Sequence, residues 1–435
     1  MIISPELAAL LPWLLFGSFA VLLLLRLPIS YCLGIAAMLC LLVVKVPLSV
    51  IPQRIFASLD SFTVMAIPLF ILAGNLMTEG GISKKLIDVA NSVLGSTQGG
   101  LGMACVLACG FFGALSGSAP ATVIAIGSML YPEMVKMGYP KKQMGGLISV
   151  SGGLGPVIPP SICLVLYGTI ANTSITDLFL SAFLIGGIML AALLVTTYIQ
   201  SKREKWPVSD QKFSIRNVLH SMRKSIWALL MPVIVLGGIY GGFLTPTEAA
   251  SVAVVYALFI SLFVYKELKP RDLGRILFES AKGGSVVLFI MATSSVFSWF
   301  FAYSGISNML VSAIRNAGLG YYPVLLLMVM ILLLFGFFLE GTATILLLIP
   351  IFMPLANSVG IHPLHLGMIL SITNVVGCMT PPVAVNIFAC STFSHLSVED
   401  ISKGELPYLI TTVLTLVIVV FFPQLSLWLP SLTGI

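Results

Sequence analysis

Residues able to bind an ion or a small ligand are concentrated in four short segments of this chain: 116–122, 151–161, 340–344 and 374–382. Each segment combines hydroxyl, amide or carboxyl side chains with glycine or proline. Proline removes a backbone donor and glycine permits sharp turns, so these residues interrupt a helix and leave backbone carbonyls free. Such carbonyls and hydroxyls are oxygen ligands that suit Na⁺, and helix N-termini aimed at the same point favour an anion. The expected chemistry is therefore the binding of Na⁺ together with an anion.

Proton binding in place of Na⁺ would require acidic side chains in these segments, and Glu340 is the one acidic residue there. We therefore expect Na⁺ coupling. An enzyme is not expected, because the apolar stretches contain no HExxH motif, no GxSxG context and no paired acidic residues. His362 and His365 are too few for a transition-metal site, and the seven cysteines lack CxxC spacing and suit apolar packing. We expect no cofactor.

The four segments form two pairs, because the second half of the chain repeats the first at an offset of 222 residues. Ala121-Thr122 aligns with Ala343-Thr344, and Pro159-Pro160 aligns with Pro381-Pro382, without a gap in between. A duplicated apolar chain with Gly/Pro interruptions at matching positions is typical of secondary transporters and locates their binding site. The alternative is that small residues only let helices approach closely. It fits 237–242, but it does not explain why Pro-Pro pairs and polar tips recur at one offset.

The composition is that of a multi-pass membrane protein. Hydrophobic residues make up 58% and charged residues 9% of the chain, and the mean hydropathy is +1.08. A helix needs about 20 apolar residues to span a bilayer. Five stretches without charged residues are long enough for this: 99–132, 143–176, 178–201, 283–314 and 341–398. The net charge of +6 reflects basic segments at 136–142, 202–224 and 266–275, which the positive-inside rule places in the cytoplasm. No nucleic-acid partner is expected.

Apolar patterning predicts the same order of elements in each half. The first half is expected to contain helices near 6–26, 28–46 and 60–78, an amphipathic stretch at 82–94, two arms flanking 116–122, a broken segment at 142–171 and a helix at 177–200. The second half is expected to contain helices near 225–242, 246–266 and 283–303, a stretch at 306–316, two arms flanking 340–344, a broken segment at 364–393 and a helix at 406–429. If each pair of arms re-enters and leaves on one side, each half crosses the membrane five times. The odd number inverts the second copy, so that both termini lie in the periplasm.

The predicted fold is an all-α polytopic membrane protein with two inverted repeats, each containing a re-entrant helical hairpin and a broken transmembrane helix. The first repeat spans 1–200, the second spans 225–435, and 201–224 is a cytoplasmic linker. The expected subdivisions are scaffold helices at about 1–80 and 225–303, interfacial arms at 82–94 and 306–316, and a hairpin with a broken helix at about 97–171 and 320–393.

Four runs carry a resemblance to a known family: SGSAPAT at 116–122, GPVIPPS at 155–161, GGIYGGFLTPTEAASVAVVYA at 237–257 and MTPPVAVN at 379–386. They resemble the large membrane subunit of tripartite ATP-independent periplasmic (TRAP) transporters over essentially the whole chain. The resemblance implies Na⁺-driven import of an organic acid, such as a C4-dicarboxylate, a sialic acid or another carboxylate, across a bacterial inner membrane. It implies two partners, a small four-helix membrane subunit and a periplasmic substrate-binding protein.

The resemblance also implies an elevator mechanism of the ion-transporter superfamily, in which the hairpins and broken helices slide against a scaffold. The alternative function is a self-sufficient Na⁺/dicarboxylate carrier of related architecture that needs no binding protein.

The resemblance places Na⁺ at the first tip with the 151–161 break and at the second tip with the 374–382 break. The candidate Na⁺ ligands are Ser118, Thr122, Gly153, Gly155, Gly341, Thr344, Gly377 and Thr380. The candidate substrate-binding residues are Ser116, Ser118, Pro159, Ser161, Glu340, Thr342, Pro381 and Asn386. Glu340 has two interpretations: it caps the N-terminus of the second arm, or it binds Na⁺ or substrate. We favour the second, because a charge at that depth costs a few kcal/mol and is usually retained for a reason.

Overall fold

The structure is a computed structural model that describes residues 5–208 and 213–433. Every regular element in these residues is a helix, apart from an isolated bridge between Gln98 and Val208. In the same residues, six helices are long and apolar enough to cross a membrane, or up to eight when each of two bent helix pairs counts as one span. The predicted all-α, multi-pass fold is confirmed.

The helices follow the predicted order in both halves. Those of the first half are α1 (Pro5–Leu24), α2 (Ile29–Val44), α3 (Val50–Leu59), α4 (Ala66–Glu79), α5 (Ile82–Leu94), α6 (Gly100–Ser116), α7 (Ala119–Lys136), α8 (Lys141–Gly152), α9 (Ile162–Ala171) and α10 (Ile175–Arg203). Those of the second half are α11 (Ile215–Lys224), α12 (Ile226–Tyr240), α13 (Pro246–Phe259), α14 (Leu273–Tyr303), α15 (Ile306–Asn316), α16 (Tyr321–Phe338), α17 (Gly341–Ser358), α18 (Pro363–Met379), α19 (Val385–Ser394), α20 (Val398–Phe421) and α21 (Gln424–Thr433).

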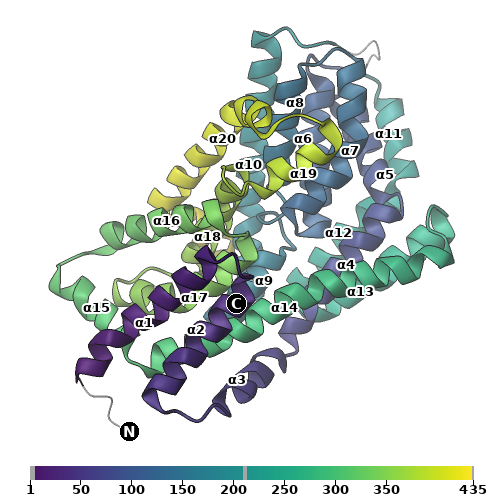
Figure 1. Ribbon diagram of the computed structural model, residues 1–435. Helices are drawn as coiled ribbons and strands as arrows, with labels where there is room; N and C mark the ends of the chain where they lie inside the picture. Colours follow the sequence, from purple (N-terminus) through teal and green to yellow (C-terminus); the bar gives the residue numbers. More distant parts are fainter. Residues whose placement is uncertain (1–4, 209–212, 434–435) are drawn as a thin grey trace.

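Short helices α5 and α15 occupy matching positions in the two halves. Each follows a glycine, Gly81 with φ 78° and Gly305 with φ 76°, in the left-handed region that favours glycine. These glycines let the chain turn out of α4 and α14 into the following helix. Figure 1 shows α5 and α15 at opposite ends of the molecule, which is the placement that two inverted copies would produce.

Several boundaries differ from the sequence-based expectation, among them the start of α20 at Val398, where position 406 was expected. The first-half helix expected at 60–78 is preceded by α3, which is bent by 68° from the 63–79 segment, whereas its second-half counterpart α14 is continuous. Helix α14 also begins ten residues before the expected position 283, because its first turns are polar and escape a search for apolar stretches. The helix expected at 406–429 is two helices, α20 and α21, separated at Pro423, which cannot continue a helix.

The hairpins and broken segments pack against one another across the two halves. Helices α7 and α8 contact α19, and α9 contacts α17; α8 also packs against α20. On the other side of the molecule, α14 packs against α2, α3 and α4, and α4 packs against α13. In Figure 1, α6, α7, α8, α19 and α20 lie together above a group formed by α1, α2, α3 and α14. Elements from both halves therefore build each group.

Candidate functional site

The first hairpin tip is the turn between α6 and α7. Gly117 provides the turn with φ 60°, and Ser118 is extended and precedes the first turn of α7. The Oγ atoms of Ser116 and Thr122 are 3.0 Å apart, and the Thr122 hydroxyl donates to the Ser118 carbonyl at 2.7 Å. The structure therefore brings Ser116, Ser118 and Thr122 together within one turn.

The first tip rests on the first broken segment, backbone against backbone. A Cβ atom on Gly155 would lie 2.8 Å from the Ser118 carbonyl oxygen, and one on Gly117 would lie 3.0 Å from the Ile162 amide nitrogen. Ser161 caps α9 by accepting from the Leu164 amide at 3.4 Å, and its hydroxyl donates to the Pro156 carbonyl at 2.6 Å. The hydroxyl of Ser161 is thus already engaged within the break.

The second tip repeats this arrangement between α16 and α17. The Thr344 hydroxyl donates to the Glu340 carbonyl at 3.3 Å, as Thr122 does to Ser118. The Thr342 hydroxyl donates to the Glu340 carboxylate, and that carboxylate does not bond to the first-turn amides of α17. A Cβ on Gly341 would meet the Asn374 side chain, and one on Gly377 would lie 2.8 Å from the Gly336 backbone. The second tip therefore packs on the second break.

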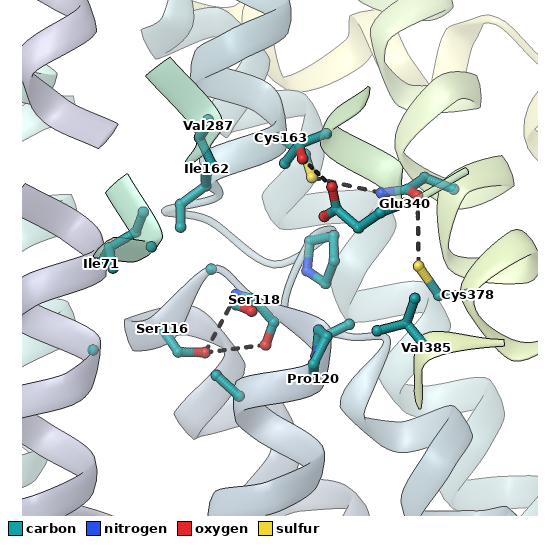
Figure 2. Close-up of a pocket in the computed structure, with 18 of the residues that line it drawn as sticks. Ile71, Ser116, Ser118, Pro120, Ile162, Cys163, Val287, Glu340, Cys378 and Val385 are labelled. Carbon is teal, nitrogen blue, oxygen red and sulfur yellow. Dashed lines mark hydrogen bonds between the residues drawn. The ribbon is translucent and has the colours of Figure 1, made fainter. Parts of the chain in front are cut away.

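A cavity of about 240 Å³ lies between the two tips and the helices α4 and α14. Figure 2 shows Ser116 and Ser118 on one side of this cavity and Glu340 on the other. Its lining residues are 116–121 at the first tip, Pro156, Ile162 and Cys163, Glu340 and Thr342 at the second tip, Asn374, Cys378 and Val385, and Ile71, Gly74, Asn75, Gly283 and Val287 of α4 and α14. Ser116, Ser118, Glu340 and Thr342 are the predicted substrate residues that line it.

Four helices begin at this cavity. Ala119 of α7, Ile162 of α9, Thr342 of α17 and Val385 of α19 lie at the first or second position of their helices, and all four line it. Each helix N-terminus carries unpaired amides and about half a positive charge. Among the described lining residues there is no lysine, arginine or histidine, and Glu340 is the one acidic residue. The positive potential in the cavity therefore comes from the backbone.

The other predicted substrate residues do not line the cavity. Pro159 is buried within the first break, whereas Pro381 is exposed, and Ser161 caps α9 as described above. Asn386 is fully buried, and its amide donates to the Ser149 carbonyl of α8 at 3.0 Å.

Predicted Na⁺ ligands such as Gly155, Gly341 and Gly377 lie in the contacts between each hairpin and its break, whereas Ser118 also lines the cavity. Gly153 faces Met379, the last residue of α18, so that the two breaks also touch one another. The hydroxyl of Thr380 donates to the Val376 carbonyl at 2.8 Å. The candidates of each half thus lie at or next to one tip and its break.

Sequence reasoning named Asn374 only as part of a segment and did not name Asn75. Asn374 lies between Cys163 and Cys378, with its amide nitrogen 3.5 Å from the Cys163 sulfur, and both cysteines line the cavity. Asn75 donates to the Ser280 hydroxyl of α14 at 2.8 Å. Asn75 is an isolated asparagine within an apolar helix, and it lies outside the repeated Gly/Pro breaks. This polar residue in an apolar stretch is the signal that would have identified it.

Comparison with known proteins settles the family. The family model for the tripartite ATP-independent periplasmic transporter, DctM component, matches residues 16–425. The chain belongs to the DctM family.

Curated relatives of this DctM-family chain agree over nearly its whole length. The C4-dicarboxylate TRAP transporter large permease protein of Rhodobacter capsulatus is 38% identical over 97% of this chain and 99% of that protein. The sialic acid TRAP transporter large permease protein of Vibrio cholerae is 35% identical over 87% of this chain and 89% of that protein. The predicted resemblance to a TRAP large subunit is confirmed.

A solved structure shares the fold at low sequence identity. The YdaH transporter of Alcanivorax borkumensis superimposes with a TM-score of 0.63 over 96% of this chain and 98% of that one, at 16% identity. At this identity the similarity shows a shared fold and does not indicate the substrate.

Proposed function

We propose that this chain is the large subunit of a TRAP transporter that imports a small organic acid with Na⁺ across a bacterial inner membrane. Its proposed partners are a small four-helix membrane subunit and a periplasmic substrate-binding protein. The observation that carries the proposal is the convergence of four helix N-termini and two hairpin tips on one cavity. Such termini bind carboxylates through their free amides and the helix dipole.

The charge balance of the cavity favours coupling to Na⁺. A carboxylate substrate would enter a site that has no basic side chain among the described lining residues and that already holds Glu340. Cations bound behind the tips would offset this repulsion and so make substrate binding depend on Na⁺. The proposed ligands are oxygens of the first tip with its break and of the second tip with its break, where helices α6, α8, α16 and α18 end with free carbonyls.

The substrate class follows from the relatives. The two relatives above are named for the transport of a C4-dicarboxylate and of a sialic acid, and both are carboxylates. We propose the same class for this chain.

The proposed elevator motion fits the composition of the cavity wall. The hairpins and breaks form one wall, and α4 and α14 form the other with Ile71, Gly74, Gly283 and Val287. A Cβ on Gly74 would lie 3.4 Å from the Ser116 Cα, so the first tip runs close against α4. Apart from Asn75, the wall formed by α4 and α14 consists of small and apolar residues, which offer little resistance to sliding. We retain the division into inverted repeats at 1–200 and 225–435, joined by 201–224, as part of this proposal.

The central test is uptake by the purified proteins in proteoliposomes. We expect uptake of the carboxylate bound by the cognate periplasmic protein to require an inward Na⁺ gradient, that binding protein and the small subunit. Omission of any one should reduce uptake to the background of empty liposomes. Uptake by this chain alone would instead support the self-sufficient carrier, and equal uptake with a proton gradient and no Na⁺ would contradict Na⁺ coupling.

A second prediction concerns orientation. With five crossings in each half, the linker lies in the cytoplasm and the C-terminus in the periplasm. A cysteine at the exposed position Lys205 should react with a membrane-impermeant maleimide only after cells are opened, whereas one at the exposed Ser431 should react in cells with a permeable outer membrane. The native cysteines of the described chain are all buried and supply the background. Labelling of both positions from the same side would rule out this topology.

A further inference from the structure

The linker between the two halves contains an amphipathic helix, α11, that the sequence pattern did not separate from its basic surroundings. The pair α11 and α12 is bent by 68°. Because α12 is an apolar helix of 15 residues, α11 leaves its end at a steep angle instead of extending it. Figure 1 shows α11 running beside α5 at the end of the molecule opposite α15. Helix α11 therefore lies beside α5 at one end of the protein, at a steep angle to α12.

Helix α11 packs against α5, and polar residues of α11 line a pocket at this contact. Ser225, at the bend, is fully buried, and its hydroxyl donates to the Lys85 carbonyl of α5 at 3.0 Å. Asn217, His220 and Lys224 are exposed and line a pocket of about 290 Å³ together with Asp88 and Asn91 of α5. The Lys85 ammonium in turn lies 5.6 Å from the centre of the Tyr265 ring. These contacts fix the rotation of α11 about its own axis.

The apolar side of α11 consequently points away from the protein. Ile215, Leu219 and Met222 follow the i, i+4, i+7 spacing of one helix face, and they are 68%, 62% and 41% exposed. Trp227, at the start of α12, is also exposed, and tryptophan is enriched where a chain enters the membrane interface. Burial of this apolar face therefore requires contact with lipid acyl chains or with an apolar surface of a partner protein.

The basic residues beside this apolar face indicate that it contacts an anionic lipid bilayer. Arg216 and Arg223 are exposed and follow Ile215 and Met222 directly, so they border the apolar stripe. Helix α11 carries three basic and no acidic residues, and the segment 202–224 contains seven lysines or arginines against two acidic residues. A basic amphipathic helix of this kind binds the surface of an anionic bilayer, with its apolar face among the acyl chains.

We propose that α11 is a membrane-surface helix that binds anionic phospholipids of the inner leaflet. Ile215, Leu219 and Met222 insert among the acyl chains, and Arg216 and Arg223 contact the phosphate groups. Because α11 is held on α5, and α5 packs against α6 and α7, the lipid surface fixes the position of the arm that supports the first hairpin. This inference does not depend on the identity of the substrate or the coupling ion.

The first test measures the depth of α11 in the membrane. Leu219→Cys and Asn217→Cys variants carry a spin label in nanodiscs of phosphatidylcholine with added phosphatidylglycerol. We expect the label at 219 to collide with lipid-soluble oxygen and the label at 217 to collide with a water-soluble nickel complex. A label at 219 that is open to the nickel complex overturns the proposal. Shielding of that label from both reagents when the small subunit is added would also overturn it and assign this face to a protein contact.

The second test measures lipid preference. The Arg216→Gln/Arg223→Gln variant should retain phosphatidylglycerol over phosphatidylcholine on the order of tenfold less well than the wild type. The matched control is Lys136→Gln/Lys141→Gln, which removes the same charge from two exposed residues outside α11 and should leave the preference unchanged. An equal loss in the two variants would show a general effect of net charge and would overturn the proposal.

Discussion

Alanine at Gly377 or Gly155 is expected to reduce Na⁺-dependent uptake at least tenfold while the protein still folds. A Cβ at Gly377 would lie 2.8 Å from three backbone atoms of Gly336, and one at Gly155 would lie 2.8 Å from the Ser118 carbonyl oxygen. Real Cβ atoms do not approach backbone so closely, so the tip and its break must separate. Overpacking of this kind costs about 1–3 kcal/mol. The displaced carbonyls are the proposed Na⁺ ligands, so ion binding should suffer more than the fold.

The matched control for these variants is Gly187→Ala. Gly187 lies within α10 and has no atom within 4 Å of an added Cβ, so alanine there should stabilise the helix by up to about 1 kcal/mol. The measurements are the elution profile in detergent, the rise in melting temperature on adding Na⁺, and uptake. Monodisperse Gly377→Ala and Gly155→Ala proteins that keep the wild-type Na⁺-induced rise would show that the tip-to-break contacts do not hold the ion.

Local features of the sequence were sufficient to predict the helix interruptions at the tips and at the two breaks. Glycine and proline act on their own backbone, so the turns near Gly117 and Gly341 and the breaks after α8 and α18 lie where the residue types place them. The offset of 222 residues then pairs Thr122 with Thr344, which make the same hydroxyl-to-carbonyl bond. These parts required no knowledge of distant contacts.

Contacts between distant segments were not predictable in the same way. Asn386 lies near a break in sequence, yet the packing of α19 on α8 directs its amide to the Ser149 carbonyl. Glu405 follows three charged residues, Glu399, Asp400 and Lys403. Such a charged segment is typical of a turn in water, in which Glu405 would be exposed. It is 1% exposed, because the glycine pair Gly146 and Gly404 lets α8 and α20 approach closely at this level. Residue type alone does not specify such approaches.

The cavity wall formed by α4 and α14 was also absent from the prediction. Asn75 and Gly283 lie in continuous helices without a break, so the Gly/Pro interruptions that identified the tips did not point to them. They line the cavity because α4 and α14 pack against each other and face the tips. A cavity between two groups of helices has one half that is identified only in three dimensions.

Replacement of Glu340 by glutamine is expected to raise the Na⁺ concentration for half-maximal uptake roughly tenfold or more, the loss typical of an interaction with a charged group. Figure 2 shows the Glu340 side chain directed into the space between the tips. The carboxylate accepts a hydrogen bond from Thr342, and no basic residue lines the cavity in the described part of the chain. An uncompensated carboxylate beside a carboxylate substrate is tolerable when a cation is bound at the same place. Glutamine preserves the shape of the side chain and removes the attraction for that cation.

The capping interpretation of Glu340 predicts a different pattern, and two variants separate the roles. A cap stabilises the N-terminus of α17 through the first-turn amides, which glutamine can still satisfy and alanine cannot, at a cost of about 1 kcal/mol. The structure shows no bond from the carboxylate to those amides. We therefore expect Glu340→Gln and Glu340→Ala to lose Na⁺ affinity together while their melting temperatures without Na⁺ stay near that of the wild type. Wild-type Na⁺ affinity in Glu340→Gln, combined with a lower melting temperature in Glu340→Ala, would establish the cap and remove Glu340 from the proposed site.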